Sequence, residues 1–254
     1  MQRETAKQAW QKEEGQAFAG WDFSYLKDRW HSAGCDFDYA AIVRGCLHPA
    51  DQLLDMGTGG GEVLLSLSHP CQNTSVTEAW PPNIALCQRK LAPLGIRVHP
   101  VSDDGRLPMA VNTFDIVINR HESYDLAEVA RVLKPGGLFI TQQVGGQNCA
   151  RLNECVNIPP LPHTPFSPET EAPQLKAHGF SVEHVDESFS ELKFFDVGAI
   201  VFFVKQIPWH FPDFSVERNF EKLLALEEAV TRDGCFADAE HRFIIVARNR
   251  GGTQ

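Results

Sequence analysis

Residues 53–63 read LLDMGTGGGEV, and this stretch decides the fold. Directly after an apolar run and Asp55, it carries four glycines within five positions. Glycine loses more backbone freedom on folding than any other residue, so such a cluster needs a reason. A strand that ends at Asp55 and turns at Gly57 into a helix near Gly61 supplies one, because glycines permit a sharp turn and let a ligand approach main-chain amides. The stretch predicts a strand, a turn and a helix in an α/β sheet.

Short apolar runs alternate with helix-like stretches along much of the chain. We expect strands at residues 52–56, 75–77, 98–101, 114–119, 138–144, 181–185 and 242–247. We expect helices at residues 61–68, 83–93 and 124–133. Strands and helices in alternation predict a parallel sheet that is covered on both faces. The proline-rich residues 157–173 predict an exposed connector without regular structure.

Composition limits the class of protein. The chain has 254 residues, is 43% hydrophobic and carries a formal net charge of −10. It is long enough for one large domain, and the negative charge disfavours nucleic acids and anionic membranes as partners. Seven scattered cysteines without a CxxC pair argue against a zinc ribbon and fit reduced thiols in a cytoplasmic protein. The N-terminal residues lack a signal-peptide core, and the longest apolar run, 197–204, is too short to span a bilayer.

The glycine pattern excludes two common nucleotide-binding motifs. GTGGGE lacks the third glycine of the dinucleotide fingerprint, and no Gly-Lys-Ser/Thr of a P-loop follows. Glu78, however, ends the second predicted strand 23 positions after Asp55, close to the spacing of an acid that accepts hydrogen bonds from ribose hydroxyls. A tight strand-to-helix crossover without a ligand is the alternative, and Glu78 favours the ligand.

Five motifs in order carry a family resemblance: LLDMGTGGGE, VTEAWPPNI, VSDDGRLPM, FDIVINRHESYD and VARVLKPGGLFITQQVG. They resemble the successive motifs of class I S-adenosylmethionine (SAM)-dependent methyltransferases, over roughly residues 52–144. The resemblance implies a Rossmann-like, doubly wound α/β fold with a seven-stranded, mostly parallel sheet and an antiparallel last strand. It also implies SAM as the cofactor, S-adenosylhomocysteine as the product and no metal.

The resemblance implies a cofactor site at the ends of the strands. Asp55 and the glycine turn would line the methionine part of SAM, and Glu78 would hold the ribose. Trp80 would flank the adenine or simply pack, and Asp103, with Asp104 as its competitor, would meet the adenine amino group or cap a turn. The predicted cofactor-binding residues are Asp55, Gly57, Thr58, Gly59, Gly60, Glu78, Ala79, Trp80, Asp103, Asp104, Asn119 and Arg120.

Methyl transfer from a sulfonium is an in-line displacement, so the protein must align the two reactants and, for a hydroxyl acceptor, remove a proton. His121 is the first candidate for the catalytic base because its ordinary pKa suits proton transfer near neutrality, and Glu122 is the second. Alternatively, Arg120 and Glu122 form an ion pair while His121 packs. An amine or thiolate acceptor would need no base at all.

Aromatic segments outside the core motifs predict where an acceptor binds. We expect residues 1–48 to form a helical lid and residues 49–254 the methyltransferase domain, with a substrate-binding insertion at about 191–232. The alternatives are a buried face of an amphipathic helix, above all for Trp30, and a structural corner at residues 207–215. The predicted substrate-binding residues are Trp21, Tyr25, His121, Gln143, Phe195, Trp209 and His210.

Three classes of function stay open. The acidic charge and the aromatic segments favour a methyltransferase acting on a small molecule, present as a monomer or homodimer without a membrane partner. The core also resembles ribosomal-RNA guanine methyltransferases, whose cysteine-rich zinc module has no counterpart in this sequence. A SAM-binding protein without methyl transfer is the third class, because this fold hosts many functions.

Overall fold

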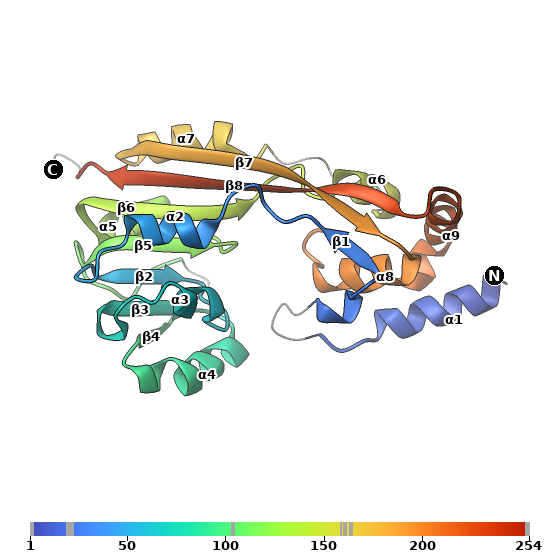
Figure 1. The fold of residues 1–254 in the computed structure, drawn as a ribbon, viewed down its shortest axis with the longest axis horizontal. Helices are drawn as coiled ribbons and strands as arrows, with labels where there is room; N and C mark the ends of the chain where they lie inside the picture. The colour runs from blue at the N-terminus through green and yellow to red at the C-terminus, as the bar shows by residue number, and fades with distance from the viewer. Residues whose placement is uncertain are drawn as a thin grey trace. The chain divides into compact units, whose positions relative to one another are not determined.

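The computed structural model describes residues 3–18, 23–102, 105–157, 159, 162 and 165–251. The helices are α1 (Arg3–Glu14), α2 (Tyr39–Cys46), α3 (Glu62–Ser66), α4 (Pro81–Lys90), α5 (Leu126–Val132), α6 (Ala150–Val156), α7 (Pro168–Ala177), α8 (Val197–Gln206) and α9 (Val216–Asp233), as Figure 1 shows. The strands are β1 (Trp30–Ser32), β2 (Leu53–Met56), β3 (Thr74–Glu78), β4 (Arg97–Pro100), β5 (Phe114–Arg120), β6 (Leu133–Val144), β7 (Phe180–Phe194) and β8 (Phe236–Asn249). Short 3-10 turns lie at Ser24–Leu26, Cys71–Asn73 and Ala92–Leu94.

The strands form one sheet in the order β1-β7-β8-β6-β5-β2-β3-β4. Strand β2 pairs in parallel with β3 and β5, and the parallel pairing continues from β3 to β4 and from β5 to β6. Strand β8 is antiparallel to β6. The predicted Rossmann-like fold with an antiparallel last strand is therefore confirmed.

Strand β1 is an addition to the seven predicted strands. It pairs antiparallel with β7, with Trp30 opposite Phe194. The alternative that Trp30 lies on the buried face of an amphipathic helix was wrong. Asp28 adopts a left-handed backbone conformation, with φ of 63°, and a right-handed helix cannot continue through such a residue. The spacing of the aromatic residues does not predict the left-handed conformation of Asp28 or the pairing of β1 with β7.

The prediction of an irregular connector at residues 157–173 was also wrong in part, because α7 begins inside it. Pro168 is the first residue of this helix, where its missing N–H costs nothing. The Thr170 hydroxyl accepts a hydrogen bond from the Ser167 N–H at 3.1 Å, which fixes the entry to the helix. A proline-rich stretch thus contained a helix start.

The chain divides into two compact units. Unit 1 comprises residues 1–35, 146–164 and 189–241, and unit 2 comprises residues 36–145, 165–188 and 242–254. Strands β7 and β8 contribute residues to both units. The roles of residues 1–48 as a lid and of residues 191–232 as a substrate-binding insertion stay predictions.

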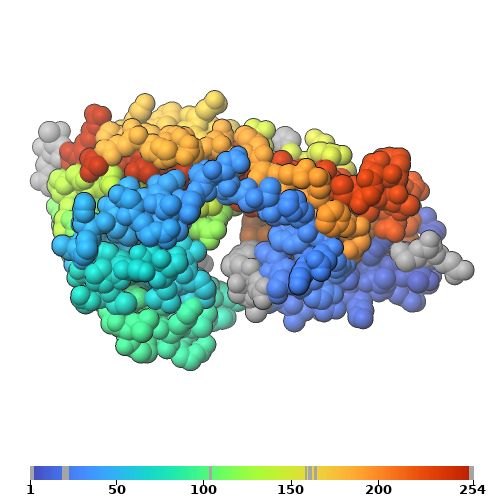
Figure 2. All heavy atoms as spheres, viewed as in Figure 1, coloured from blue at the N-terminus to red at the C-terminus, as the bar shows by residue number. Residues whose placement is uncertain are grey.

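Unit 2 holds the glycine-rich turn and has a core on each face of its strands. Helices α2, α3 and α4 cover one face, where Val43, Leu64 and Cys87 are buried. Helices α5 and α7 cover the other, where Val129 and Leu175 are buried. In Figure 2 the atoms of α2 to α4, coloured blue to green, form the outer surface of the first face.

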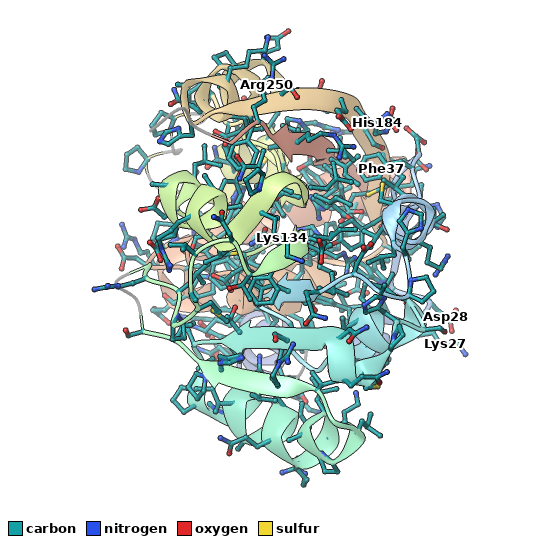
Figure 3. The ribbon with its side chains drawn as sticks, turned by 90° about the vertical axis from the view of Figure 1, so that its left-hand side faces the viewer. Lys27, Asp28, Phe37, Lys134, His184 and Arg250 are labelled. Carbon is teal, nitrogen blue, oxygen red and sulfur yellow. The ribbon has the colours of Figure 1, made fainter. Side chains whose placement is uncertain are left out.

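An ion pair fixes the amino ends of the central strands in unit 2. The Lys134 ammonium, labelled in Figure 3, lies 2.9 and 2.7 Å from the two carboxylate oxygens of Asp115. The same carboxylate accepts a hydrogen bond from the Gln52 backbone N–H at 2.9 Å. These contacts join the starts of β2, β5 and β6. The amino ends of these strands are therefore occupied by structural contacts, and the search for a ligand site turns to their carboxyl ends.

Unit 1 is built around α8. All residues from 197 to 204 are buried in this helix, which packs against α1 and α9. Aromatic rings complete the core, and the Phe194 and Phe203 ring centroids lie 5.1 Å apart. The apolar run is therefore a core helix. Within the described part of the chain, no helix combines the length and apolarity needed to cross a membrane.

The buried Phe139 gives a test of the unit 2 core. Its ring contacts those of Tyr124 and Phe180. Phe139→Ala should lower the free energy of unfolding by about 3–5 kcal/mol, because it leaves a cavity in a packed core. Urea denaturation followed by circular dichroism measures this change. The exposed Val111→Ala serves as the control, and equal stability of the two variants would contradict this description of the core.

Candidate active site

The carboxyl ends of β2 and β5 define the site. From β2 the chain proceeds outward to β3 and β4, and it then returns to form β5 on the other side of β2. Such a reversal of strand order opens a crevice at the carboxyl ends of the strands, where α/β proteins bind ligands. Met56 pairs with Asn119 across these strands, so the glycine turn and the residues that follow β5 emerge side by side.

Gly57, directly after β2, lies against Glu122, which follows β5. Its φ is 67°, a left-handed conformation that side chains rarely tolerate. A methyl group added at Gly57 would lie 2.5 Å from Cγ and 2.6 Å from Cβ of Glu122. The turn therefore needs glycine here for two reasons: the left-handed backbone conformation and the lack of space beside Glu122, one of the two candidate bases.

The turn itself is anchored to β3. The backbone N–H groups of Gly57 and Thr58 both donate to the Thr77 carbonyl oxygen, at 3.1 and 3.2 Å. Gly59 also has a left-handed φ, of 59°, but a methyl group there would meet nothing within 4 Å. The turn thus presents open backbone at Gly59, as a ligand that rests against the main chain requires.

Glu78 ties the turn to the start of α4. Its carboxylate accepts hydrogen bonds from the backbone N–H groups of Gly59 at 2.9 Å, and of Ala79 and Trp80 at 3.0 Å each. The Asn83 amide lies 3.4 Å away. A carboxylate has about four lone-pair sites, so these donors occupy the whole group. Ribose hydroxyls bound there would replace part of this set.

Asp55 is a buried carboxyl group, only 7% exposed, on the same strand as the turn. Burial raises its pKa to about 7, a shift that the Thr58 hydroxyl and the positive charge of Arg120 reduce and the charge of Glu78 increases. Ionised, this group would have a strong need for a cation. The ammonium group of the methionine part of SAM supplies one, so the residue fits the cofactor.

Tyr39, at the start of α2, was not identified from the sequence. Its hydroxyl is buried and has no hydrogen-bond partner among the described residues. Burial and the nearby charge of Asp55 raise its pKa well above the ordinary value. Tyr39 lies 16 positions before Asp55 in a helix without a motif, so no sequence signal pointed to it.

His121 follows β5 in a left-handed conformation, with φ of 63°. Its backbone N–H donates to the Gln142 carbonyl at 2.9 Å, and its Nε2 lies 3.2 Å from the Gln142 side-chain amide nitrogen. Although the residue is exposed, the protein around its ring and the charges of Arg120 and Arg242 lower its pKa. The ring is neutral at pH 7 and weakly basic, which argues against His121 as a base; its role stays a prediction.

The structure brings most of the other predicted residues in unit 2 to this edge. Thr58, Gly60, Ala79, Asn119 and Arg120 lie in the turn or at the ends of β3 and β5. Trp80 precedes α4 and is 56% exposed, so its ring is available to a ligand. Gln143, near the end of β6, is buried. Asp103, Asp104 and Trp21 lie outside the described residues.

The remaining predicted substrate-binding residues belong to unit 1. The Tyr25 hydroxyl donates to Glu13 at 2.9 Å, and its ring packs 4.7 Å from that of Phe202. Phe195 and Trp209 are 42% and 68% exposed. The backbone carbonyl of His210 accepts a hydrogen bond from Asn157. Their contact with an acceptor stays a prediction.

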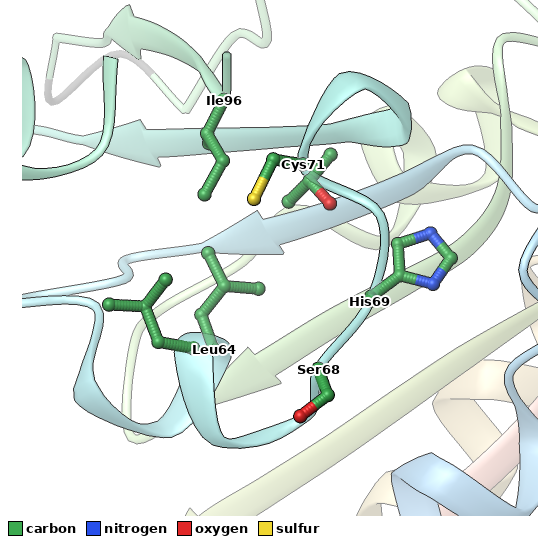
Figure 4. Close-up of a pocket in the computed structure, with 7 residues that line it drawn as sticks. Leu64, Ser68, His69, Cys71 and Ile96 are labelled. Atoms are coloured by element: carbon green, nitrogen blue, oxygen red, sulfur yellow. The ribbon is translucent and has the colours of Figure 1, made fainter. Parts of the chain in front are cut away.

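A cavity of about 160 Å³ lies away from this site (Figure 4). Leu64, Ser68, His69, Cys71 and Ile96 line it, together with Leu65 and Thr74. Thr74 begins β3, so the cavity adjoins the amino end of that strand, whereas the glycine turn follows a carboxyl end. Among the described residues, no group of three or more His, Cys, Asp or Glu side chains could hold a metal ion.

Comparisons with known proteins agree with this geometry. Residues 54–141 match the family model described as "Methyltransferase domain". The uncharacterized methyltransferase YodH of Bacillus subtilis is 25% identical over 117 residues, which cover 43% of this chain and 50% of YodH. This chain thus spans about half the length of the curated relative it matches.

Solved structures share the fold at lower identity. The YcgJ protein of Bacillus subtilis superposes with a TM-score of 0.60 at 18% identity, covering 84% of this chain and 99% of YcgJ. The [4+2]-cyclase SpnF superposes with a TM-score of 0.54 at 16% identity, covering 97% of this chain and 94% of SpnF.

The glycine turn, the acids at the strand ends and these matches define a SAM-dependent methyltransferase domain. Residues 54–141 thus form a methyltransferase domain that resembles the class I superfamily, and SAM is the cofactor of this domain.

The raised pKa of Asp55 predicts a pH-dependent stability. The folded protein retains this proton up to about pH 7, whereas the ordinary pKa is 3.8, so ionisation destabilises the native state as the pH rises between these values. The substitution Asp55→Asn removes this loss of stability, because the amide does not ionise. The gain in free energy of unfolding over wild type should grow from about pH 4 to pH 7 and then level off.

Urea denaturation of the SAM-free protein at several pH values measures this gain. The exposed Asp28→Asn is the control, because Asn also tolerates the left-handed conformation there. A gain for Asp55→Asn that does not vary with pH would contradict the assignment.

The hydrogen bonds of Glu78 predict a loss of cofactor affinity in Glu78→Ala. Each charge-assisted hydrogen bond contributes roughly 1.5–3 kcal/mol, and the substitution also releases the turn from α4. Calorimetric titration with SAM should show binding weakened by at least about tenfold. Glu62→Ala, an exposed acid beside the same turn, should bind SAM like wild type. Unchanged affinity in Glu78→Ala would remove Glu78 from the cofactor site.

Proposed function

We propose that the protein transfers the methyl group of SAM to a small-molecule acceptor through an oxygen, nitrogen or sulfur nucleophile. The observation that carries this choice is the charge: the chain has a net charge of −10. Many of its cationic side chains are also engaged by carboxylates, among them Arg29, Lys90, Arg131, Lys134 and Arg248. A polyanion such as RNA needs unneutralised cations to release its counterions.

The chain's own residues supply binding and alignment in this proposal. Asp55 would meet the ammonium group of the cofactor, the open backbone at Gly59 would receive it closely, and Glu78 would accept hydrogen bonds from the ribose. When bound, SAM supplies a methyl group already activated by a sulfonium. Holding the acceptor in line with that bond accounts for much of the rate, since alignment alone can remove roughly 7–11 kcal/mol of a barrier.

Glu122 is the stronger of the two proposed bases. It is exposed and lies over Gly57 at the junction of the strand ends. Its carboxylate accepts hydrogen bonds from the backbone N–H and the hydroxyl of the neighbouring Ser123, at 3.1 and 3.2 Å. The His121 ring already faces the amide of Gln142 and has a lowered pKa. We therefore place proton removal, where the acceptor requires it, on the Glu122 carboxylate.

Two other functions remain as alternatives. An RNA methyltransferase would need a basic surface, against which the net charge argues. A protein that binds SAM without methyl transfer is consistent with the fold, because the [4+2]-cyclase SpnF shares that fold. We propose that the protein is cytoplasmic and a monomer or homodimer; none of the seven cysteines, all of which the structure describes, forms a disulfide.

Two measurements separate these functions. A thermal-shift titration with SAM and S-adenosylhomocysteine should raise the melting temperature with either nucleoside, because both bind the folded state. Tritium transfer from methyl-labelled SAM should then label a metabolite extract and not total RNA. Labelling of RNA alone would favour an RNA methyltransferase. Binding of SAM without transfer to either pool would favour a SAM-binding protein that transfers no methyl group.

The assignment of the base gives a further prediction. If Glu122 removes the proton, Glu122→Gln should reduce transfer to a hydroxyl acceptor by about 10²–10⁴-fold and leave SAM affinity near that of wild type. His121→Ala should keep most of the activity. Single-turnover transfer of the tritiated methyl group measures both variants. If His121→Ala lost most of its methyl-transfer activity while Glu122→Gln remained active, His121 and not Glu122 would be the base.

A further inference from the structure

A buried network of side chains lies at the ends of β5 and β6 and is not explained by packing. The Gln143 amide nitrogen lies 2.6 Å from Asn119 Oδ1, 2.8 Å from the Thr141 hydroxyl and 3.2 Å from the Glu122 carbonyl oxygen. The Thr141 hydroxyl lies 3.2 Å from the same Asn119 oxygen. Asn119 and Thr141 are 0% exposed, and Gln143 is 6% exposed.

The network fixes which atom of Asn119 remains available. The carbonyl oxygen of Glu122 can only accept a hydrogen bond, so Gln143 must turn its NH₂ group toward it. That NH₂ group then donates to Asn119, which must present its oxygen in return. The Asn119 nitrogen consequently points away from Gln143 and has no partner among the described residues. An orphaned buried donor destabilises the folded protein, so its retention calls for a ligand.

The strand register separates this amide from the acids of the cofactor site. Asp55 is in register with Val76 and Ile118, and Glu78 follows Val76 by two positions on the same face. Asn119 is in register with Met56 and Thr141, one position further along, so it faces the other side of the sheet. The amide therefore lies at the carboxyl edge near the glycine turn, but on the face opposite Asp55 and Glu78.

We propose that the Asn119 amide does not bind the cofactor, as the family resemblance implied, but binds an oxygen atom of the methyl acceptor, and that Gln143 is the residue that positions it. An N–H donor pairs with the lone pair of a hydroxyl, phenolate, carboxylate or carbonyl oxygen and rejects a protonated amine. The site thus selects acceptors that carry oxygen next to, or at, the methylated atom. This inference rests on the proposed function, because it assumes an acceptor bound beside SAM.

The first experiment observes the amide directly. The side-chain amide signals of Asn119 are identified in the ¹⁵N spectrum of the full chain by their loss in Asn119→Asp. With S-adenosylhomocysteine present, phenol and benzoate should shift these signals, whereas benzylamine should not. Equal shifts with benzylamine, or no shift with either oxygen probe, would overturn the proposal.

The positioning role of Gln143 has its own readout. In Gln143→Glu the new carboxylate cannot donate, so Asn119 turns its nitrogen toward it and exposes its oxygen instead. Preference should then reverse, with benzylamine shifting the Asn119 signals and phenol losing its effect. A residue that served only for packing would weaken all probes alike, and that result would remove Gln143 from the proposal.

Cofactor binding separates this inference from the proposed function. Calorimetry should give SAM affinities within about threefold for wild type, Asn119→Asp and the control Asn112→Asp, which makes the same change at an exposed turn before β5. A loss of about tenfold or more in Asn119→Asp alone would show that the amide serves the cofactor and would overturn the inference only. Failure of the wild-type protein to bind SAM would instead contradict the proposed function.

Discussion

The carboxylate of Glu78 is the constraint on which the candidate site depends. It is buried at the end of β3, and it accepts hydrogen bonds from Gly59 in the turn after β2 and from Ala79 and Trp80 before α4. Ladder hydrogen bonds hold β2 to β3, but they end where the strands end. One side chain therefore fixes the backbone both of the turn after β2 and of the start of α4, where the proposed nucleoside would rest. Hydrogen bonds to an ionised acceptor are about twice as strong as neutral ones, which suits a turn made of four glycines.

The central part of the fold could be predicted because its determinants are local. Alternating apolar runs and the glycine turn mark β2 to β6, and these strands lie close to their predicted positions, except that β6 already begins at Leu133 rather than at residue 138. Strand β1 and helix α7 could not be predicted in this way. The first depends on the left-handed residue Asp28 and on pairing with a strand 160 residues away, and the second begins inside a proline-rich segment.

The candidate site was predictable in position but not in chemistry. Residues that follow parallel strands meet at one edge, so Asp55, Glu78 and Asn119 could be grouped from the sequence. Tyr39 could not, because a helix before the first motif delivers it. The weak basicity of His121 depends on the neighbouring charges of Arg120 and Arg242, and Arg242 lies on β8, more than a hundred residues further along. Neither the position of Tyr39 nor the lowered pKa of His121 can be predicted from the spacing of residues along the chain.

In the proposed reaction, the two faces of the sheet serve different reactants at its carboxyl edge. On one face lie the two acids Asp55 and Glu78, and Asp55 offers negative charge once it ionises, which suits a cation that also carries ribose hydroxyls. On the other, Asn119, Thr141 and Gln143 offer neutral hydrogen-bonding groups whose directions are set by a backbone carbonyl. A carboxylate in place of Asn119 would repel an anionic nucleophile and would stabilise the sulfonium reactant, in which the positive charge is largest. A neutral donor holds the nucleophile without either penalty, so the placement of acids on one face and amides on the other favours the transfer itself.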